Sequence, residues 1–384
     1  MRTPVYLDNH ASTAPDPAVL EVMQRVARDH YGNPASAGHA FGWAAARVVE
    51  DAREHVAALA GVQARGIVFC GGATEALNLA VLGLAAAGDG PGHVVATALE
   101  HAAVRAPLSW LAARGWRVTD VGVDASGVVD PDEVAAAVTA DTRLVCCLAA
   151  QNEIGTLQPV AALGAACRAR GIPLLCDAAQ AAGRVPLAGE RDGIALLALS
   201  AHKMYGPKGV GALHVSRRDP RVTLAPLAHG GGQERGLRPG TPDVAGIAGF
   251  GEACRLALAR QDADASALHA LAARFLARLE SRVGGVVVHG DRLRRLPGSL
   301  SLGFTGLGGA ALLPAVPQLA LSAGAACSSG SDRTSPILAA IGVPRELAAA
   351  TVRLCFARTS TEEEADFAAD TLAEAVGRLR AARA

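Results

Sequence analysis

The feature that most constrains the fold is a series of short runs that are apolar on both alternating faces. They are GIVFC, HVVATA, RLVCCLAA, IPLLCD and IALLALS, and they are bounded by Gly, Asp or Asn. Strands of this kind belong to a mostly parallel sheet covered by helices on both faces. Helical patterns alternate with the runs near 17–31, 41–60, 73–87, 102–114 and 160–170. The alternation predicts an α/β fold.

The last third of the chain has a different character. A long Ala/Leu/Arg helix is predicted near 262–283, and strands are predicted in VGGVVVHG, SLSLGF and LALSAG before a final helix from about 362. A chain of 384 residues has room for two or more domains. We therefore predict a large domain and a smaller α+β domain, covering 15–258 and 1–14 plus 259–384 respectively.

Charge and cysteine content exclude several classes of protein. Lys plus Arg equals Asp plus Glu at 36 each, so no overall field draws the chain to nucleic acid or to an anionic membrane. No signal peptide or membrane-spanning run is visible. The eight cysteines form no C-x-x-C pair, which argues against a structural metal site. We expect a soluble cytoplasmic protein with reduced thiols, no direct contact with nucleic acid and no metal.

Polar residues gather at the ends of the five apolar runs. In a parallel sheet, ligands bind beyond the carboxyl ends of the strands. Following the runs in order, these residues are the segment GGATE, Glu100 with His101, Asn152 with Glu153, Asp177 with Gln180, and Ser200 with His202 and Lys203. The sequence therefore predicts that polar groups from five strand ends meet in one region.

The glycine pair before a helix that begins at Ala73 is suited to an anion, because helix N-termini offer free N–H groups. A simple tight turn is the alternative. Lys203 follows a buried strand, where partial desolvation lowers the pKa of a lysine and favours Schiff-base formation; a solvated loop lysine is the alternative. Asp177 ends an apolar strand and should face a cation, for which a protonated pyridine nitrogen is suited.

Ordered motifs along the whole chain resemble those of NifS/IscS-type cysteine desulfurases. They are YLDNHASTAPDP, GNPASAGHAFG, GGATEALNLA, EHAAV, NEIGTLQPV, CDAAQAAGRVP, SAHKMYGPKGVGAL, GGGQERGLRPGTPD and SAGAACSSG. The resemblance implies the fold-type I architecture of pyridoxal 5'-phosphate (PLP) enzymes, with a seven-stranded sheet. It also implies a homodimer with active sites at the interface, and conversion of L-cysteine to L-alanine plus an enzyme persulfide.

The resemblance also implies roles for individual residues. Lys203 would form the Schiff base, Asp177 would face the pyridine nitrogen, Gln180 would lie near the ring hydroxyl, and His101 would stack on the ring and handle protons. The phosphate ligands would be Ala73, Thr74, Ser200 and His202, with Thr241 contributed by the neighbouring subunit. Asn152 and Arg353 would hold the substrate carboxylate, although Arg353 alone is also compatible with an ordinary ion pair.

Cys327 is the residue that discriminates among PLP enzymes. It lies in LALSAGAACSSGSD, a Gly-rich, small-residue segment typical of a mobile loop. The resemblance makes it the thiol that receives sulfur as a persulfide and passes it to an acceptor or scaffold protein. From composition alone, an inert thiol is an equal alternative.

The segment before Cys327 departs from the usual pattern of the family. Gly308 or Gly309 replaces an acidic residue, and Pro314 and Pro317 are added, which we expect to stiffen the approach to Cys327. We also expect Cys327 to rest away from the cofactor and to reach it by loop movement.

Other functions share parts of this pattern. A PLP-dependent aminotransferase or a selenocysteine lyase would keep Lys203 and Asp177, and a non-catalytic partner protein would keep only the fold. For a desulfurase, iron–sulfur assembly, tRNA thiolation and DNA phosphorothioation are all open. The variant segment around Cys327 is weakly similar to that of the DNA phosphorothioation desulfurase.

Overall fold

The centre of the molecule is a seven-stranded sheet. The structure, a computed structural model, describes residues 3–307, 311–323 and 335–383. The strands are β2 (Ile67–Cys70), β3 (His93–Thr97), β4 (Arg117–Val121), β5 (Thr142–Cys146), β6 (Leu174–Asp177), β7 (Leu196–Ser200) and β8 (Gly211–Val215). Their order is β2-β8-β7-β6-β5-β3-β4, and only β8 runs antiparallel to its neighbours. The predicted α/β fold with a mostly parallel sheet is confirmed.

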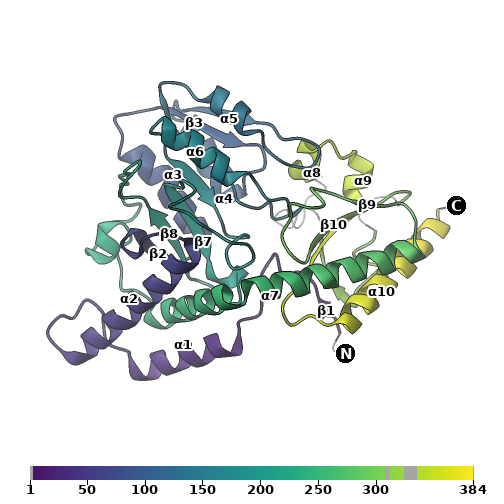
Figure 1. Ribbon diagram of the computed structural model, residues 1–384, viewed down its shortest axis with the longest axis horizontal. Helices are drawn as coiled ribbons and strands as arrows, with labels where there is room; N and C mark the ends of the chain where they lie inside the picture. Colours follow the sequence, from purple (N-terminus) through teal and green to yellow (C-terminus); the bar gives the residue numbers. More distant parts are fainter. Residues whose placement is uncertain (1–2, 308–310, 324–334, 384) are drawn as a thin grey trace.

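Helices cover both faces of this sheet (Figure 1). The helices on one face are α2 (Ala40–Ala60), α5 (Pro131–Ala137), α6 (Val160–Ala169) and the first part of α7 (Val244–Arg282). Those on the other face are α3 (Ala73–Ala86) and α4 (Ala102–Ala112), while α1 (Pro17–Asp29) packs against α7. Short 3-10 turns η1 (Ala64–Gly66), η2 (Ala201–Lys203) and η3 (Gln233–Gly236) complete this part.

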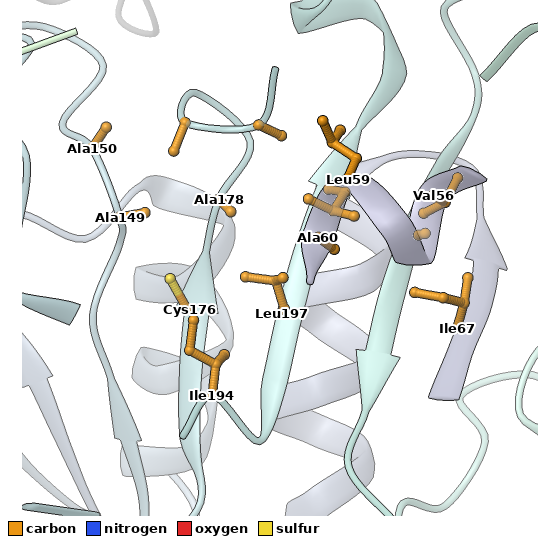
Figure 2. Close-up of a cluster of buried hydrophobic side chains, with 14 of the residues drawn as sticks. Val56, Leu59, Ala60, Ile67, Ala149, Ala150, Cys176, Ala178, Ile194 and Leu197 are labelled. Carbon is orange, nitrogen blue, oxygen red and sulfur yellow. The ribbon is translucent and has the colours of Figure 1, made fainter. Parts of the chain in front are cut away.

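The strands are apolar on both faces because each face meets helices. In β2, Ile67 belongs to the core on the α2 side, whereas the next residue, Val68, belongs to the core on the α3 side. Figure 2 shows α2 residues, among them Leu59, lying over the sheet near Ile67 and Leu197. Alternating side chains thus enter two separate cores, as the sequence pattern predicts.

A second core joins the two ends of the chain. Its antiparallel sheet has the order β12-β13-β10-β9, and β1 pairs with β11 in parallel. The strands are β1 (Val5–Tyr6), β9 (Val286–Val288), β10 (Ser299–Phe304), β11 (Leu319–Ala320), β12 (Ser322–Ala323) and β13 (Thr351–Cys355). The helices α8 (Pro336–Ala340), α9 (Arg345–Ala349) and α10 (Glu362–Ala381) belong to the same end of the molecule. Leu7 and Phe275 are fully buried together in this core.

The long helix α7 connects the two cores (Figure 1). We predicted a helix only near 262–283, but α7 begins at Val244, where Asp243 caps it through the Gly246 N–H. The early part was missed because it is rich in glycine. At Gly249 and Gly251 an added Cβ would lie 2.6–2.7 Å from atoms of α1 and α2, so glycine permits close helix packing there. Our proposed domain boundary at 258–259 therefore falls inside one continuous helix.

Two strands of the large sheet were not predicted. β4 is an edge strand with mostly exposed or half-exposed side chains, so it lacks the apolar signal. β8 follows a Gly/Pro loop, and its polar His214 is nevertheless buried. Among the helices of the described ranges, none is long and apolar enough to cross a membrane.

Candidate active site

A cavity of about 540 Å³ lies beyond the carboxyl ends of β2, β3, β5, β6 and β7. The predicted site residues that line it are Ala73, Thr74, His101, Asn152, Asp177, Gln180, Ser200, His202, Lys203 and Arg353. They come from six separate segments of the chain. The cavity also includes His10 and Ala11 of the YLDNHASTAPDP motif, for which no role was predicted.

The N-terminus of α3 forms one side of the cavity. Gly72 is its N-cap with φ 147°, a conformation that favours glycine, and its residue type supplies no capping side chain. A Cβ on Gly211 would lie 2.7 Å from the Gly72 Cα, so β8 approaches this turn closely. Thr74, Ser200 and His202 face the same cavity. Backbone N–H groups and these side chains can together bind a phosphate.

His202 is held as a neutral ring. Its Nδ1 lies 3.2 Å from the Ser12 hydroxyl. Burial, followed by the charges of Lys203 and Lys208, lowers its pKa to about 4. At neutral pH, therefore, one ring nitrogen carries a proton and can donate a hydrogen bond to an anion.

Asp177 is the last residue of β6 and is only 8% exposed. One of its carboxylate oxygens accepts a hydrogen bond of 2.9 Å from the Ala179 N–H. Burial raises its pKa, while the Ala179 hydrogen bond and the charges of His101 and Lys203 oppose the rise. A carboxylate whose burial is only partly compensated in this way is suited to pairing with a further cation inside the cavity.

Lys203 ends η2, directly after β7. Its Nζ donates hydrogen bonds to the backbone carbonyls of His10 and Ala11, the second at 2.9 Å. The amine is thus fixed at the cavity wall by the N-terminal segment of the chain. This arrangement supports the reading of Lys203 as a positioned site lysine over the solvated alternative.

Gln180 and His10 are joined by a hydrogen bond in the lining of the cavity. Gln180 Nε2 donates to the His10 carbonyl at 2.9 Å, and within the described ranges its buried Oε1 has no partner. His10 Nδ1 lies 2.9 Å from the Asn152 carbonyl, so Nδ1 is the donor. Burial, then the charges of Arg184 and Arg353, lower the pKa of His10 well below its ordinary range. His10 is therefore a neutral structural donor.

His101 caps α4 and is oriented by that role. Its Nδ1 accepts a hydrogen bond of 3.1 Å from the Ala103 N–H. In the neutral ring the proton consequently sits on Nε2. A ring held in this tautomer at the cavity wall can donate from Nε2 and can move a proton there.

The Arg353 side chain extends from β13 toward Asn152, which follows β5. Its Nη2 donates to Asp8 at 2.8 Å and its Nη1 to the Asn152 carbonyl at 3.1 Å. The side chain is almost fully buried, and its Nε has no partner among the residues described. A guanidinium fixed in this way can receive a carboxylate from the cavity.

Two buried acids stand behind the strand ends. Glu100 accepts hydrogen bonds from the Thr97 hydroxyl and the Leu148 N–H, and burial raises its pKa to about 7. Glu153 accepts from the Ser335 hydroxyl, and burial likewise raises its pKa to about 7. Both were noted at strand ends in the sequence, but neither lines the cavity.

Two predicted residues are not among the described residues that line this cavity. Thr241 lines a different pocket, beside Tyr31 and Asn33. Cys327 lies outside the described residues, as do Gly308 and Gly309, so the expected resting position of Cys327 stays a prediction. Pro314 and Pro317 lie next to the buried Leu312 and Val316 of the second core.

The cavity residues suit PLP. The α3 N-terminus offers a phosphate site, Asp177 offers a buried negative charge, and the unpartnered Gln180 Oε1 offers an acceptor for a hydroxyl. Lys203 supplies an amine on the same cavity. Within the described part of the chain, no cluster of three or more His, Cys, Asp and Glu side chains is placed to hold a metal ion.

Comparisons with known proteins agree on one family. Residues 5–367 match the aminotransferase class-V family. The chain is 44% identical to the cysteine desulfurase IscS of Anaeromyxobacter dehalogenans over 99% of this chain and 94% of that protein. Among solved structures, a NifS-like protein superposes with a TM-score of 0.90 at 34% identity, covering 99% and 100% of the two chains. DndA from Streptomyces lividans superposes with a TM-score of 0.77 at 36% identity, covering 90% and 97%. The chain belongs to the aminotransferase class-V family.

Proposed function

We propose that this protein is a PLP-dependent cysteine desulfurase. The observation that carries the proposal is a single cavity in which Lys203, Asp177 and Arg353 converge from β7, β6 and β13. The Lys203 amine and the Asp177 carboxylate are suited to binding the cofactor, and the Arg353 guanidinium is suited to binding the carboxylate of an amino acid. Relatives named cysteine desulfurase cover nearly the whole chain, which supports this reaction over others of the family.

The cofactor would be held by residues of the cavity. Lys203 would bind its aldehyde, Asp177 would face its ring nitrogen, and Gln180 Oε1 would accept from its ring hydroxyl. The phosphate would lie against the α3 N-terminus, with Thr74, Ser200 and His202 as further ligands. When bound, PLP supplies an electron sink for the bonds at the substrate α-carbon.

L-cysteine would enter with its carboxylate toward Arg353 and Asn152. Arg353 is anchored by Asp8, so its orientation does not depend on the substrate. Fixing the carboxylate fixes the direction of the substrate side chain, which turns its sulfur toward one part of the cavity. His101 would give and take protons at its Nε2, since Nδ1 is engaged with Ala103.

Cys327 would accept the sulfur. Its sulfur attacks the substrate sulfur, a new S–S bond forms, and the substrate C–S bond breaks. The electron pair of that bond stays with carbon, which takes up a proton and becomes the methyl group of L-alanine. A thiol of an acceptor or scaffold protein then attacks the outer sulfur of the Cys327 persulfide, a new S–S bond forms, and the Cys327 thiolate leaves, so no oxidant is consumed.

A second copy of the chain would complete the site. Tyr31, Phe41 and Trp43 are large and exposed, at 71%, 55% and 60%, and the rings of Tyr31 and Phe41 lie 5.5 Å apart. Large apolar side chains exposed within one short segment of the chain are suited to an interaction surface. Thr241 lies beside Tyr31 in the neighbouring pocket, which supports its role as a phosphate ligand across a homodimer interface.

The site of action is proposed to be the cytoplasm. The seven described cysteines are all free and buried, which suits a reducing compartment. Similarity extends both to IscS and to DndA, so it does not select among iron–sulfur assembly, tRNA thiolation and DNA phosphorothioation. Because the chain carries no net charge, a partner protein would make any contact with nucleic acid.

The test is to identify products and the residue that holds the cofactor. Purified protein with PLP, L-cysteine and a thiol reductant should release alanine and sulfide without an oxo-acid acceptor, because the reductant frees the persulfide sulfur as sulfide. Borohydride should fix the cofactor to the peptide containing Lys203, detected by mass. Cys327→Ser should keep that adduct and lose desulfuration, with buried Cys254→Ser as the control for a thiol change. Sulfide release at the normal rate from Cys327→Ser, or strict dependence on an oxo acid, would refute the proposal.

A further inference from the structure

Arg184 is a buried cation for which the described residues provide no carboxylate. It is 7% exposed and appears in none of the ion pairs of the described ranges. Its Nη1 donates to the Cys355 sulfur at 2.9 Å, and its Nη2 donates to the Asn9 carbonyl at 2.9 Å. Burial of a charge is costly, so a guanidinium held in this way needs a specific structural reason.

The two partners of Arg184 stand next to the two members of the Asp8–Arg353 ion pair. Asn9 follows Asp8 in the chain, and Cys355 lies two positions beyond Arg353 in β13. Residues two apart in a strand point to the same face. Asn9 Nδ2 also donates to the Cys355 carbonyl at 2.7 Å. The Cys355 N–H donates to the Leu7 carbonyl at 2.7 Å, and Arg184 adds a side-chain link to each of the two segments from which Asp8 and Arg353 project.

Arg184 itself belongs to the segment that follows β6. This segment also carries Asp177 and Gln180, and its Arg184 N–H is bonded to the Ala181 carbonyl at 3.0 Å. Gln180 reaches the same N-terminal segment through the His10 carbonyl. The side of the cavity proposed to hold the cofactor is therefore tied to the side proposed to hold the substrate carboxylate.

We propose that Arg184 is a positioning residue for recognition of the substrate carboxylate, because it fixes the Asp8–Arg353 pair relative to the segment that follows β6. The inference rests on the proposed function. The forked guanidinium spans two acceptors that belong to different segments, Cys355 and Asn9. A lysine amine at this position keeps the charge but loses the fork.

The first test is Arg184→Lys in the PLP-loaded dimer. We expect KM for L-cysteine to rise about tenfold, with kcat and the cofactor absorbance within about twofold of wild type. The dissociation constant of L-alanine, measured by calorimetry, should rise by a similar factor. An unchanged KM and L-alanine affinity in a folded, PLP-loaded variant would overturn the inference.

The matched control is Arg53→Lys. Arg53 is equally buried, at 5% exposure, but it pairs with Glu234 and, within the described ranges, bonds to neither Asn9 nor Cys355. Its loss should lower the melting temperature without changing KM. A rise of KM in both variants would mean that general destabilisation is responsible, and would overturn the specific role of Arg184.

Cys355 provides a second route if Arg184→Lys does not fold. Cys355→Ala removes an acceptor of Arg184, whereas Cys355→Ser keeps one. We expect a higher KM in the alanine variant and near-normal KM in the serine variant. Cys254→Ala, at an equally buried thiol, should leave KM unchanged. Equal KM in the Cys355→Ala and Cys355→Ser variants contradicts the inference.

A double-mutant cycle separates this inference from the proposed function. In an Arg353→Lys background, Arg184→Lys should add much less than its own tenfold effect, because both act on one interaction. Full additivity would overturn the positioning role. If Arg353→Lys by itself leaves KM and L-alanine affinity unchanged, the proposed substrate site fails instead.

Discussion

One wall of the cavity is made by the ends of neighbouring strands of the large sheet. The other is made by two distant segments in which side-chain contacts add to backbone hydrogen bonds. Asp177 and Lys203 follow β6 and β7 directly, so the hydrogen bonds of the sheet set their positions. Asp8 and Arg353 are 345 residues apart in sequence and meet through an ion pair. The Cys355 N–H also donates to the Leu7 carbonyl at 2.7 Å, so the backbone helps to position both walls. The second wall differs because its two segments are joined in addition by charged side chains.

This difference predicts different responses to substitution. A strand end keeps its place when one side chain changes, because the backbone ladder stays intact. Substitution on that wall should therefore remove one chemical group and little else. On the other wall, a lost contact also removes one of the links between the two segments. Its effects should spread to substrate affinity and stability together.

The largest effect is expected for Asp177→Asn on the strand-end wall. The amide cannot supply the negative charge that we propose for the cofactor ring nitrogen, so kcat should fall at least about a hundredfold. The melting temperature of the cofactor-free protein should stay equal or rise, because burial already disfavours the charged acid. Steady-state kinetics and thermal unfolding test these two outcomes.

The control for Asp177→Asn is Asp120→Asn. Asp120 pairs with Arg105 on an exposed surface and should change neither quantity. A wild-type kcat in Asp177→Asn would show that Asp177 does not have the central role proposed for it. A strong loss of stability would contradict the view that the backbone positions this wall.

A smaller effect is expected for Asp8→Asn on the other wall. The variant weakens a charge-assisted hydrogen bond to Arg353, so KM for L-cysteine should rise about tenfold while the cofactor absorbance persists. The melting temperature should also fall, since Arg353 would lose its counter-charge in a buried place. A fall in kcat with constant KM would show that the two walls do not differ as described.

The sequence predicted the strand-end wall more fully than the other one. Asp177, Ser200 and Lys203 were found because they interrupt or follow strongly apolar runs, a signal that lies within a few residues. His10 and Arg184 were not assigned a role. Their positions depend on contacts with Asn152 and Cys355, and no local pattern reports such distant pairings.

The fold shows the same division. Strands buried on both faces were predicted closely, but the edge strand β4 was missed because its side chains are largely exposed. The start of α7 was missed because its glycines serve close packing with α1 and α2, a tertiary requirement that weakens the local helix signal. Local sequence patterns therefore predict the buried strands of the sheet and the residues at their ends, but not features set by tertiary packing.

The smallest expected effect concerns pH and the buried Glu100 behind the strand-end wall. Its pKa is raised to about 7 by burial, so between its unfolded value of 4.5 and 7 the folded state binds the proton more tightly. Stability contributed by this group is present at low pH and is lost as the pH rises through that window. Glu100→Gln carries no charge at any pH and should abolish this contribution.

Thermal unfolding at pH 5 and at pH 8 measures the effect. The decrease in melting temperature from pH 5 to pH 8 should be smaller in Glu100→Gln than in wild type, by about 5 °C at most. Glu374→Gln, on the exposed side of α10, should leave the wild-type dependence intact. An equal dependence in Glu100→Gln would mean that Glu100 is ionised in the fold throughout this range. Its hydrogen bonds from Thr97 and Leu148 would then outweigh the cost of its burial.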